Sequence, residues 1–176
     1  MEMKEINVYC DGSTSNNGSN QATGGYGVYF PEDESLNMSF QYTHEIPTNQ
    51  KTELYAMMMA IRQCILYIKN LSTDKEEITG EPMQNVKYIF NIHTDSMYTI
   101  NCLDKWMANW IKKGMKKADG KPVQNTHILD PLYKLYTRFK DTNTMQIKLH
   151  HINAHTGKTD IHSLGNAMAD KLSRTY

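Results

Sequence analysis

Alternating apolar and polar residues characterise the beginning of the chain. Apolar side chains stand at every second position in three successive segments, namely Ile6, Val8 and Cys10, then Tyr26, Val28 and Phe30, then Leu36, Met38, Phe40 and Tyr42. A period of two places one side of a strand against a core. We therefore predict three antiparallel strands, with a turn at residues 31–33 between the second and the third. Residues 12–25, rich in Gly, Ser, Asn and Thr, predict a flexible hairpin loop and lack the Gly-Lys-Ser/Thr ending of a phosphate-binding P-loop.

After Pro47 the hydrophobic period changes from two to three or four. The apolar residues with this spacing are Leu54, Met57, Met58, Ile61, Ile65 and Ile68. They predict a helix of roughly five turns with one buried face, for which Thr48 or Asn49 is the N-cap. Residues 70–85 form an acidic segment that contains Gly and Pro, and we interpret this segment as a surface-loop insertion.

Residues 86–93 are apolar enough for a central strand. Beyond them the pattern predicts short helices up to about residue 113, a basic turn to residue 125, a helix at 128–140, a strand at 146–151 and a helix at 161–173 in which Leu164, Met168 and Leu172 share one side. This order predicts an α/β fold: a five-stranded mixed sheet, three antiparallel strands plus two parallel ones, flanked by helices. A right-handed crossover through the long helix would make the first and fourth strands parallel. Their carboxyl ends contain Asp11 and Asp95, and ligand sites of open α/β sheets lie at such ends.

Composition limits the class of protein. A chain of 176 residues with 39% hydrophobic content can form one core without disulfide or metal staples, so we expect a single domain over residues 1–176. The three cysteines form no Cys-x-x-Cys pair, which favours reduced thiols and an intracellular location. No apolar stretch is long enough for a membrane span. We expect a soluble monomer with no membrane association and no obligate protein partner.

The formal net charge of zero conceals an uneven distribution. Between Lys105 and Lys121 there are six lysines and one acid, a local charge of +5, so the rest of the chain has a charge of −5. A basic segment beside acidic residues suits a protein that attracts a polyanion in one place and holds divalent metal in another. The usual alternative for a run of charge is a solvated helix surface.

Four acids stand at the boundaries of the predicted elements: Asp11, Glu53, Asp95 and Asp170. Carboxylates that converge from distant parts of a chain can hold Mg²⁺, which prefers oxygen ligands and completes its shell with water and substrate phosphate. Each acid alone has a simpler explanation, because Glu53 can complement a helix dipole and Asp11 or Asp95 can cap a turn.

Five short segments, in order along almost the whole chain, resemble ribonuclease H of type 1, the cellular ribonuclease HI family. They are Asp-Gly-Ser at 11–13, Asn-Gln-Lys-Thr-Glu-Leu at 49–54, Thr-Asp-Ser at 94–96, Ala-His-Thr-Gly at 154–157 and Gly-Asn-Ala-Met-Ala-Asp at 165–170. The resemblance implies a ribonuclease H-like fold and an endonuclease that hydrolyses the RNA strand of an RNA/DNA hybrid. It further implies two Mg²⁺ ions, or Mn²⁺ in their place, and products with 5′-phosphate and 3′-hydroxyl ends.

The resemblance also assigns catalytic roles. It implies metal binding by Asp11, Glu53, Asp95 and Asp170, with Asp11 as the bridging carboxylate, and proton transfer or product departure assisted by His155. An alternative is a metal site made of His150, His151 and His155, but no cysteine or acid stands beside them at a zinc-site spacing. We assign no role to His44, His93, His127 or His162.

For substrate binding, residues 105–125 resemble the basic protrusion with which cellular enzymes of this family hold the DNA strand. The residues expected to contact nucleic acid there are Trp106, Trp110, Lys112, Lys113, Lys116, Lys117 and Lys121. By the same resemblance, Thr48 and Asn125 hold a DNA phosphate, and Asn49 and Gln50 lie near base edges in the minor groove.

The chain also departs from the family pattern. Met97 replaces a common substrate-contacting glutamine and Met115 replaces a frequent tryptophan, so substrate affinity is expected to differ. The loop after Asp11 is longer than usual, so the family's minor-groove contacts there are not transferred residue by residue. We expect no separate hybrid-binding module before the domain, and therefore no processive action. Two alternatives stay open: the ribonuclease H domain of a reverse transcriptase, and a non-catalytic hybrid-binding module. The second would retain mutually repelling acids without the metal that offsets their cost.

Overall fold

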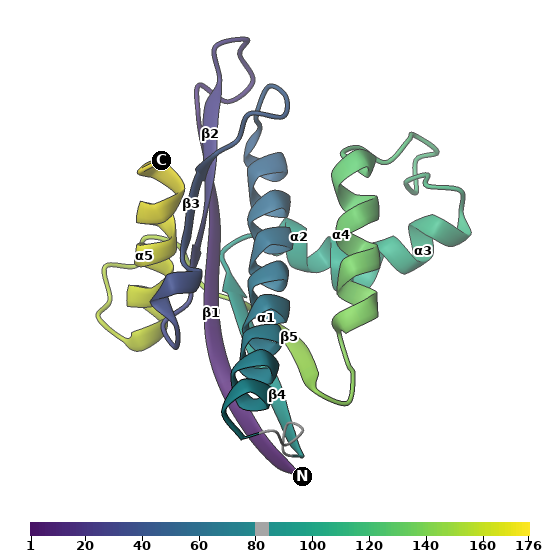
Figure 1. The fold of residues 1–176 in the computed structure, drawn as a ribbon. Helices are drawn as coiled ribbons and strands as arrows, with labels where there is room; N and C mark the ends of the chain where they lie inside the picture. Colours follow the sequence, from purple (N-terminus) through teal and green to yellow (C-terminus); the bar gives the residue numbers. More distant parts are fainter. Residues whose placement is uncertain (80–84) are drawn as a thin grey trace.

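The computed structural model describes residues 1–79 and 85–176, and in this part of the chain the strands form one mixed sheet (Figure 1). The strands are β1 (Glu2–Ser15), β2 (Thr23–Tyr29), β3 (Met38–Gln41), β4 (Val86–Thr94) and β5 (Met145–His151), arranged in the order β3-β2-β1-β4-β5. The pairs β1–β2 and β2–β3 are antiparallel, whereas β1–β4 and β4–β5 are parallel. The predicted sheet is therefore confirmed.

Helices cover both sides of this sheet. The long helix α1 (Asn49–Thr79) packs on β1 and β2, and α5 (Ile161–Arg174) packs on β1, β2 and β3 from the opposite side (Figure 1). Helix α4 (Thr126–Phe139) packs against α1. Between β4 and α4 lie α2 (Met97–Asn101), a π-helical segment (Cys102–Trp106) and α3 (Met107–Lys112).

The main core lies between the sheet and helices α1 and α4. From α1 the buried residues recur at helical spacing, and from β4 nearly every side chain is buried; the largest of these are Leu54, Met57, Ile61, Phe90 and Ile92. Burial of each such side chain stabilises the fold by about 1.5–3 kcal/mol. Helix α4 adds Ile128, Leu129, Leu132 and Tyr136. The spacing of three and four therefore reports the buried sides of α1 and α4 correctly.

The prediction of a loop at residues 70–85 is wrong for residues 70–79, which continue α1 to Thr79. This stretch contains residues that favour a helix, such as Leu71, Lys75 and Ile78, and its first glycine is Gly80. A charged composition therefore did not indicate the end of the helix. Residues 80–84 of the predicted insertion lie outside the described residues.

Two predicted boundaries near the first hairpin are also wrong. Strand β1 continues through Ser15 and pairs with β2 as far as Thr23, so part of the predicted loop is strand and Asp11 lies inside β1 rather than at its end. Leu36 belongs to a 3₁₀ turn, Glu34–Leu36, because Asp33 Oδ1 accepts a hydrogen bond from the Ser35 backbone N–H at 3.0 Å. Strand β3 is correspondingly shorter than predicted.

Small residues form the buried side of α5: Gly165, Asn166, Ala169 and Ser173. Leu164 and Met168, which share the predicted apolar side, are 54% and 38% exposed. The side of α5 that packs on the sheet is therefore not the one that the hydrophobic spacing indicates. Small side chains there allow the helix to approach the strands closely.

The cysteines Cys10, Cys64 and Cys102 are buried and free. Burial raises the thiol pKa of Cys10 and Cys64 well above the ordinary value and that of Cys102 to about 12. Within the described residues no helix combines the length and apolarity that a bilayer crossing requires.

Candidate active site

The fold brings three of the four predicted acids together. Asp11 of β1, Glu53 near the start of α1 and Asp95 directly after β4 each place a carboxylate oxygen within 4.8 Å of the others. Parallel pairing explains the meeting of the two aspartates. The register joins Tyr9 to His93, so Asp11 and Asp95 each lie two residues further along neighbouring strands.

Two glycines allow the helices to come close to Asp11. A Cβ on Gly12 would lie 2.3 Å from the carbonyl carbon of Thr52 and 2.4 Å from the backbone N of Glu53, so α1 touches the strand backbone directly. Gly27, the β2 partner of Asp11, allows α5 to touch the strand backbone in the same way, since a Cβ there would lie 2.6 Å from the Ala169 carbonyl oxygen. The position of Glu53 beside Asp11 therefore depends on backbone contact.

Asp170, the fourth predicted acid, lies on α5 outside the group of three. Its Oδ1 accepts a hydrogen bond from Arg174 Nε at 2.8 Å, an ion pair one helical turn apart. Its charge still acts on Asp11, whose pKa it helps to raise. Asp170 is thus adjacent to the acid cluster and partly neutralised by its own helix.

The three clustered acids, of which Asp11 is buried and Glu53 and Asp95 are half-buried, are held together at a high electrostatic cost. Asp11 is 3% exposed, and burial together with repulsion from Asp95 and Asp170 raises its pKa to about 8. Burial, with repulsion from Asp11 and Asp95, raises the pKa of Glu53 well above its ordinary value. Burial also raises the pKa of Asp95. The folded site therefore disfavours three simultaneous negative charges, a cost that a bound cation would offset.

The residues present fit a divalent metal ion. Glu53 Oε2 is buried and has no hydrogen-bond partner among the described residues. A buried carboxylate oxygen without a donor requires explanation, and a hard cation held by oxygen ligands supplies one. Asp11, Glu53 and Asp95, with Asp170 beside them, are the residues that would hold it.

In metal-free solution the protein is expected to lose stability as the pH rises from about 4 to about 8. The folded-state pKa of Asp11 is raised from 3.8 to about 8, so its protonated form favours the folded chain. This contribution is complete below the unfolded pKa and is lost as the pH rises through the folded one. At about 1.4 kcal/mol per pKa unit, the loss is on the order of a few kcal/mol.

Thermal unfolding in chelator at several pH values measures this loss, and Asp11→Asn supplies the comparison. The variant should show a shallower fall in melting temperature over the same pH range. Parallel curves for the two proteins would contradict the assignment of the effect to Asp11.

His155 lies in the loop between β5 and α5, exposed and with a left-handed backbone (φ 49°). It lines a cavity of about 260 Å³ that also contains Asp170, Asn153 and Asn166. Burial raises the pKa of Asp95, and the charge of His155 opposes that rise. His155 therefore lies where its charge acts on the acid cluster.

The alternative histidine metal site is not formed. Among the described residues, the group able to hold a metal ion consists of acids alone. His150 instead bonds Asn91 Oδ1 through Nε2 at 2.8 Å and stacks on His93, with ring centroids 5.1 Å apart. Histidine spacing near the end of β5 therefore reflects packing.

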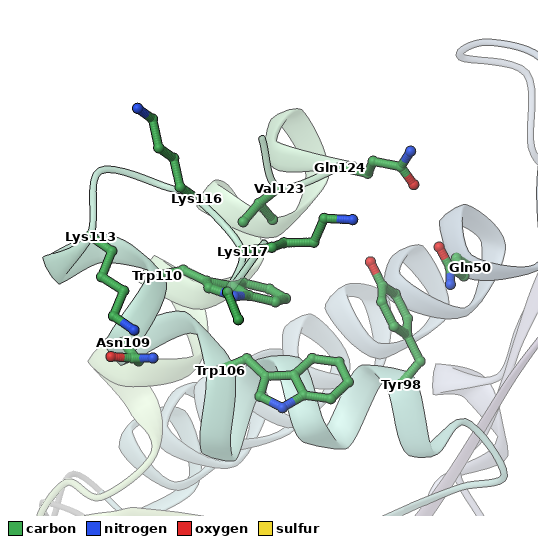
Figure 2. A pocket seen from close by; sticks show the side chains of 11 residues that line it. Gln50, Tyr98, Trp106, Asn109, Trp110, Lys113, Lys116, Lys117, Val123 and Gln124 are labelled. Carbon is green, nitrogen blue, oxygen red and sulfur yellow. The ribbon is translucent and has the colours of Figure 1, made fainter. Parts of the chain in front are cut away.

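The basic segment, residues 105–125, forms one wall of a cavity of about 510 Å³, which we call the lysine-rich cavity (Figure 2). Six of the predicted substrate-binding residues line it together: Gln50, Trp106, Trp110, Lys113, Lys116 and Lys117. The rings of Trp106 and Trp110 lie 5.5 Å apart, and Tyr98 packs on the edge of Trp106 at 6.3 Å. Figure 2 shows Lys117 extending toward the side occupied by Tyr98 and Gln50, whereas Lys116 points away from the rings. Aromatic rings and lysines thus share one concave surface.

A second cavity, of about 730 Å³, contains Thr48, Asn49 and Asn125 and shares Gln50 and Gln124 with the first. The Asn125 amide donates to Gln50 Oε1 at 3.4 Å and to the Tyr98 hydroxyl at 3.3 Å. Lys112 and Lys121 line neither cavity and are exposed. The predicted phosphate and base contacts are therefore adjacent, with Gln50 between them.

The sequence did not single out several residues of these sites. Tyr98, Asn109 and Gln124 line the lysine-rich cavity, and Ser173 contacts Asp11 from α5. The spacing of the aromatic residues Tyr98 and Trp106 could have indicated Tyr98. No pattern indicates Ser173. Of the two departures from the family pattern, Met97 is exposed and Met115 packs against the core.

A sheet of this topology, with acids where β1 and β4 end their pairing, defines a ribonuclease H-like fold. The same fold occurs in the solution structure of the PFV RNase H domain, which is 23% identical, with a TM-score of 0.65 over 97% of this chain and 93% of that one. A foamy viral protease-reverse transcriptase, solved in complex with an RNA/DNA hybrid, matches at 19% identity and a TM-score of 0.62; the match covers 96% of this chain and 19% of that one.

The family follows from the sequence itself. The RNase H family model matches residues 3–176, and the chain belongs to the ribonuclease H family. It is 32% identical to a probable ribonuclease H of Acanthamoeba polyphaga mimivirus, over 90% of this chain and 60% of that protein. It is 32% identical to ribonuclease H1 of Mus musculus, over 97% and 50%. The chain thus spans about half the length of several curated relatives that it matches.

Proposed function

We propose that this chain is an endonuclease that hydrolyses the RNA strand of RNA/DNA hybrids by a two-metal mechanism, with 5′-phosphate and 3′-hydroxyl ends as products. One observation supports this above all others. Three acids, Asp11, Glu53 and Asp95, converge just beyond the point where the parallel pairing of β1 and β4 ends, in a member of the ribonuclease H family. Retention of such costly acids is expected only where a cation uses them.

In this proposal the acids hold the metal and the surrounding residues hold the substrate. Divalent cations, when bound, stabilise charge on the phosphate and lower the pKa of a water molecule. Asp11 is the most buried of these acids, and Glu53, Asp95 and Asp170 lie around it. Mg²⁺ suits this oxygen-only set, and Mn²⁺ accepts the same ligands.

The lysine-rich cavity is proposed to hold the DNA strand. Lys113, Lys116 and Lys117 would neutralise phosphates, and Trp106 and Trp110 would contact the sugars and bases. Lys112 and Lys121, outside the cavity, would act through longer-range attraction.

The second cavity is proposed to fix the register of the hybrid. There Thr48 and Asn125 would hold a DNA phosphate, while Asn49 and Gln50 reach the minor groove. Selectivity would come from 2′-hydroxyls of the RNA strand, with little sequence readout.

His155→Ala is expected to slow turnover by about 10- to 100-fold without eliminating it, because general acid–base assistance typically contributes factors of this order or somewhat more. The imidazole lies beside the cavity that contains Asp170 and acts electrostatically on Asp95. Steady-state cleavage of a labelled hybrid measures the effect. His44→Ala, at a histidine outside this cavity, is the control, and unchanged kinetics for His155→Ala would remove His155 from the mechanism.

Incubation of labelled hybrid, RNA duplex and DNA duplex with the protein in Mg²⁺, Mn²⁺ or chelator tests the proposal. Cleavage restricted to the RNA strand of the hybrid, lost in chelator, is the expected result. Hybrid binding without cleavage would instead indicate a non-catalytic binding module. Analysis of the product ends separates the proposed 5′-phosphates from 3′-phosphate products.

The match to a protease-reverse transcriptase favours one second candidate, a ribonuclease H domain of a larger polymerase. The lysine-rich cavity and the His155 loop are compatible with either form. Polymerase sequence upstream in the natural reading frame would support this candidate.

A further inference from the structure

Ser173 lies in the last turns of α5, fully buried, with its Oγ 3.1 Å from Asp11 Oδ2 and 2.7 Å from the Asp170 carbonyl oxygen. Within the described residues it is the one hydroxyl group that hydrogen-bonds the Asp11 carboxylate. The other buried residues on this side of α5 are Gly165, Asn166 and Ala169, and the hydrogen bond to Asp11 comes from Ser173.

The backbone of Ser173 is fixed independently of its side chain. Ser13, two residues after Asp11 on β1, donates its hydroxyl to the Ser173 carbonyl oxygen at 2.7 Å. Gly25, the β2 partner of Ser13, makes room for this contact, because a Cβ there would lie 2.4 Å from the Ser173 carbonyl oxygen. The end of α5 is thus tied to β1 by one serine and to the Asp11 carboxylate by another.

A hydrogen bond to a buried carboxylate restricts the rotation of that carboxylate. An ionised carboxylate accepts hydrogen bonds only, whereas the single serine proton can be donated to either neighbouring oxygen. Donation to Asp11 Oδ2 fixes one carboxylate oxygen and leaves the other for the acid cluster. Groups that orient metal ligands in this way typically change metal affinity by 10- to 100-fold when removed.

We propose that Ser173 is a positioning residue of the metal site, which orients the Asp11 carboxylate through its hydroxyl. This inference rests on the proposed function only in taking the acid cluster as a metal site. Ser173 itself contacts neither substrate nor metal in this proposal and acts through Asp11.

The test compares Ser173→Ala with Ser13→Ala by calorimetric titration with Mn²⁺ alone, in the absence of nucleic acid. Both variants remove one buried serine hydroxyl from the same junction of α5 and β1, but only Ser173 touches Asp11. We expect Ser173→Ala to weaken Mn²⁺ binding by about 10-fold or more and Ser13→Ala to leave it within about twofold. The metal concentration for half-maximal cleavage should rise in parallel, with a smaller change at saturating metal.

Equal Mn²⁺ affinity of Ser173→Ala and the wild type would overturn the inference, as would equal weakening in both variants, which indicates loss of packing. Thermal melts in chelator establish that each variant folds. If Ser173→Ala does not fold, Ser173→Cys, with a weaker donor of similar size, is titrated with the same expectation.

The two proposals fail differently. A wild-type protein that binds Mn²⁺ but cleaves no hybrid refutes the proposed function and leaves the role of Ser173 to the titration. A wild-type protein that cleaves while Ser173→Ala binds Mn²⁺ normally refutes only the role of Ser173. Absence of Mn²⁺ binding by the wild type refutes both.

Discussion

Asp95→Asn is expected to abolish hybrid cleavage while the fold stays intact and the metal-free protein becomes more stable. Loss of one proposed metal ligand would remove several kcal/mol of charge stabilisation, which corresponds to about 10³-fold or more in rate. The gain in stability follows because burial raises the pKa of Asp95, so a neutral amide avoids the cost of a buried charge. Quantitative cleavage of labelled hybrid in Mg²⁺ and melting in chelator measure the two effects.

The matched control for this variant is Asp130→Asn. Asp130 is an exposed acid on α4 that pairs with Lys134 at 2.9 Å, far along the chain from the acid cluster. The same isosteric change there should leave the fold and cleavage unaffected. An exposed ion pair contributes at most about 1 kcal/mol to the free energy of unfolding. Full Mg²⁺-dependent activity of Asp95→Asn would refute the assignment of the active site.

Gly12→Ala is expected to destabilise the fold by about 3 kcal/mol or more and to abolish cleavage in the fraction that still folds. The added Cβ would meet the Thr52 and Glu53 backbone at 2.3 and 2.4 Å, and backbone atoms cannot rotate out of its way. Helix α1 would have to shift at its start, which moves Glu53 away from Asp11. Urea unfolding and hybrid cleavage measure the two consequences.

Gly18→Ala separates crowding from backbone strain. No atom lies within 4 Å of a Cβ at Gly18, but its φ is +86°. We expect a cost of about 1 kcal/mol in the free energy of unfolding, from the strained backbone alone. Wild-type stability of Gly12→Ala would show that α1 can adjust and that the acid cluster does not depend on this contact.

Most of the fold could be predicted from residue spacing because the buried side chains are large. Alternation at Ile6, Val8 and Cys10 and the later change to helical spacing reflect packing against one core, and the crossover rule then made β1 and β4 parallel. That pairing brought Asp11 and Asp95 together in expectation and in the structure.

The incorrect predictions concern places where hydrophobic spacing contains little information. Residues 12–15 extend β1 although they are small and polar, because the elements packed against them touch the backbone rather than apolar side chains. Residues 70–79 are helical although several of them are charged, because charged residues are compatible with a helix. Glycine and proline are the residues that disfavour it.

The site shows the same division between what the sequence contains and what only the fold provides. Carboxylates and lysines are identifiable by their chemistry, and Gln50 by its position in a recognisable segment. The hydrogen bond from Ser173 to Asp11 joins residues 162 positions apart and depends on the approach of α5 to the sheet. Its existence follows from backbone geometry, which residue spacing does not encode.

The burial of Cys10, Cys64 and Cys102 makes the native chain a convenient starting point for thiol-directed labelling. Only the thiolate reacts with maleimides, and all three thiols are inaccessible and held protonated by their surroundings. A cysteine placed at exposed Ala118, on the wall of the lysine-rich cavity, would be the single reactive thiol. A fluorophore attached there would report arrival and departure of nucleic acid in real time, without removal of any native cysteine.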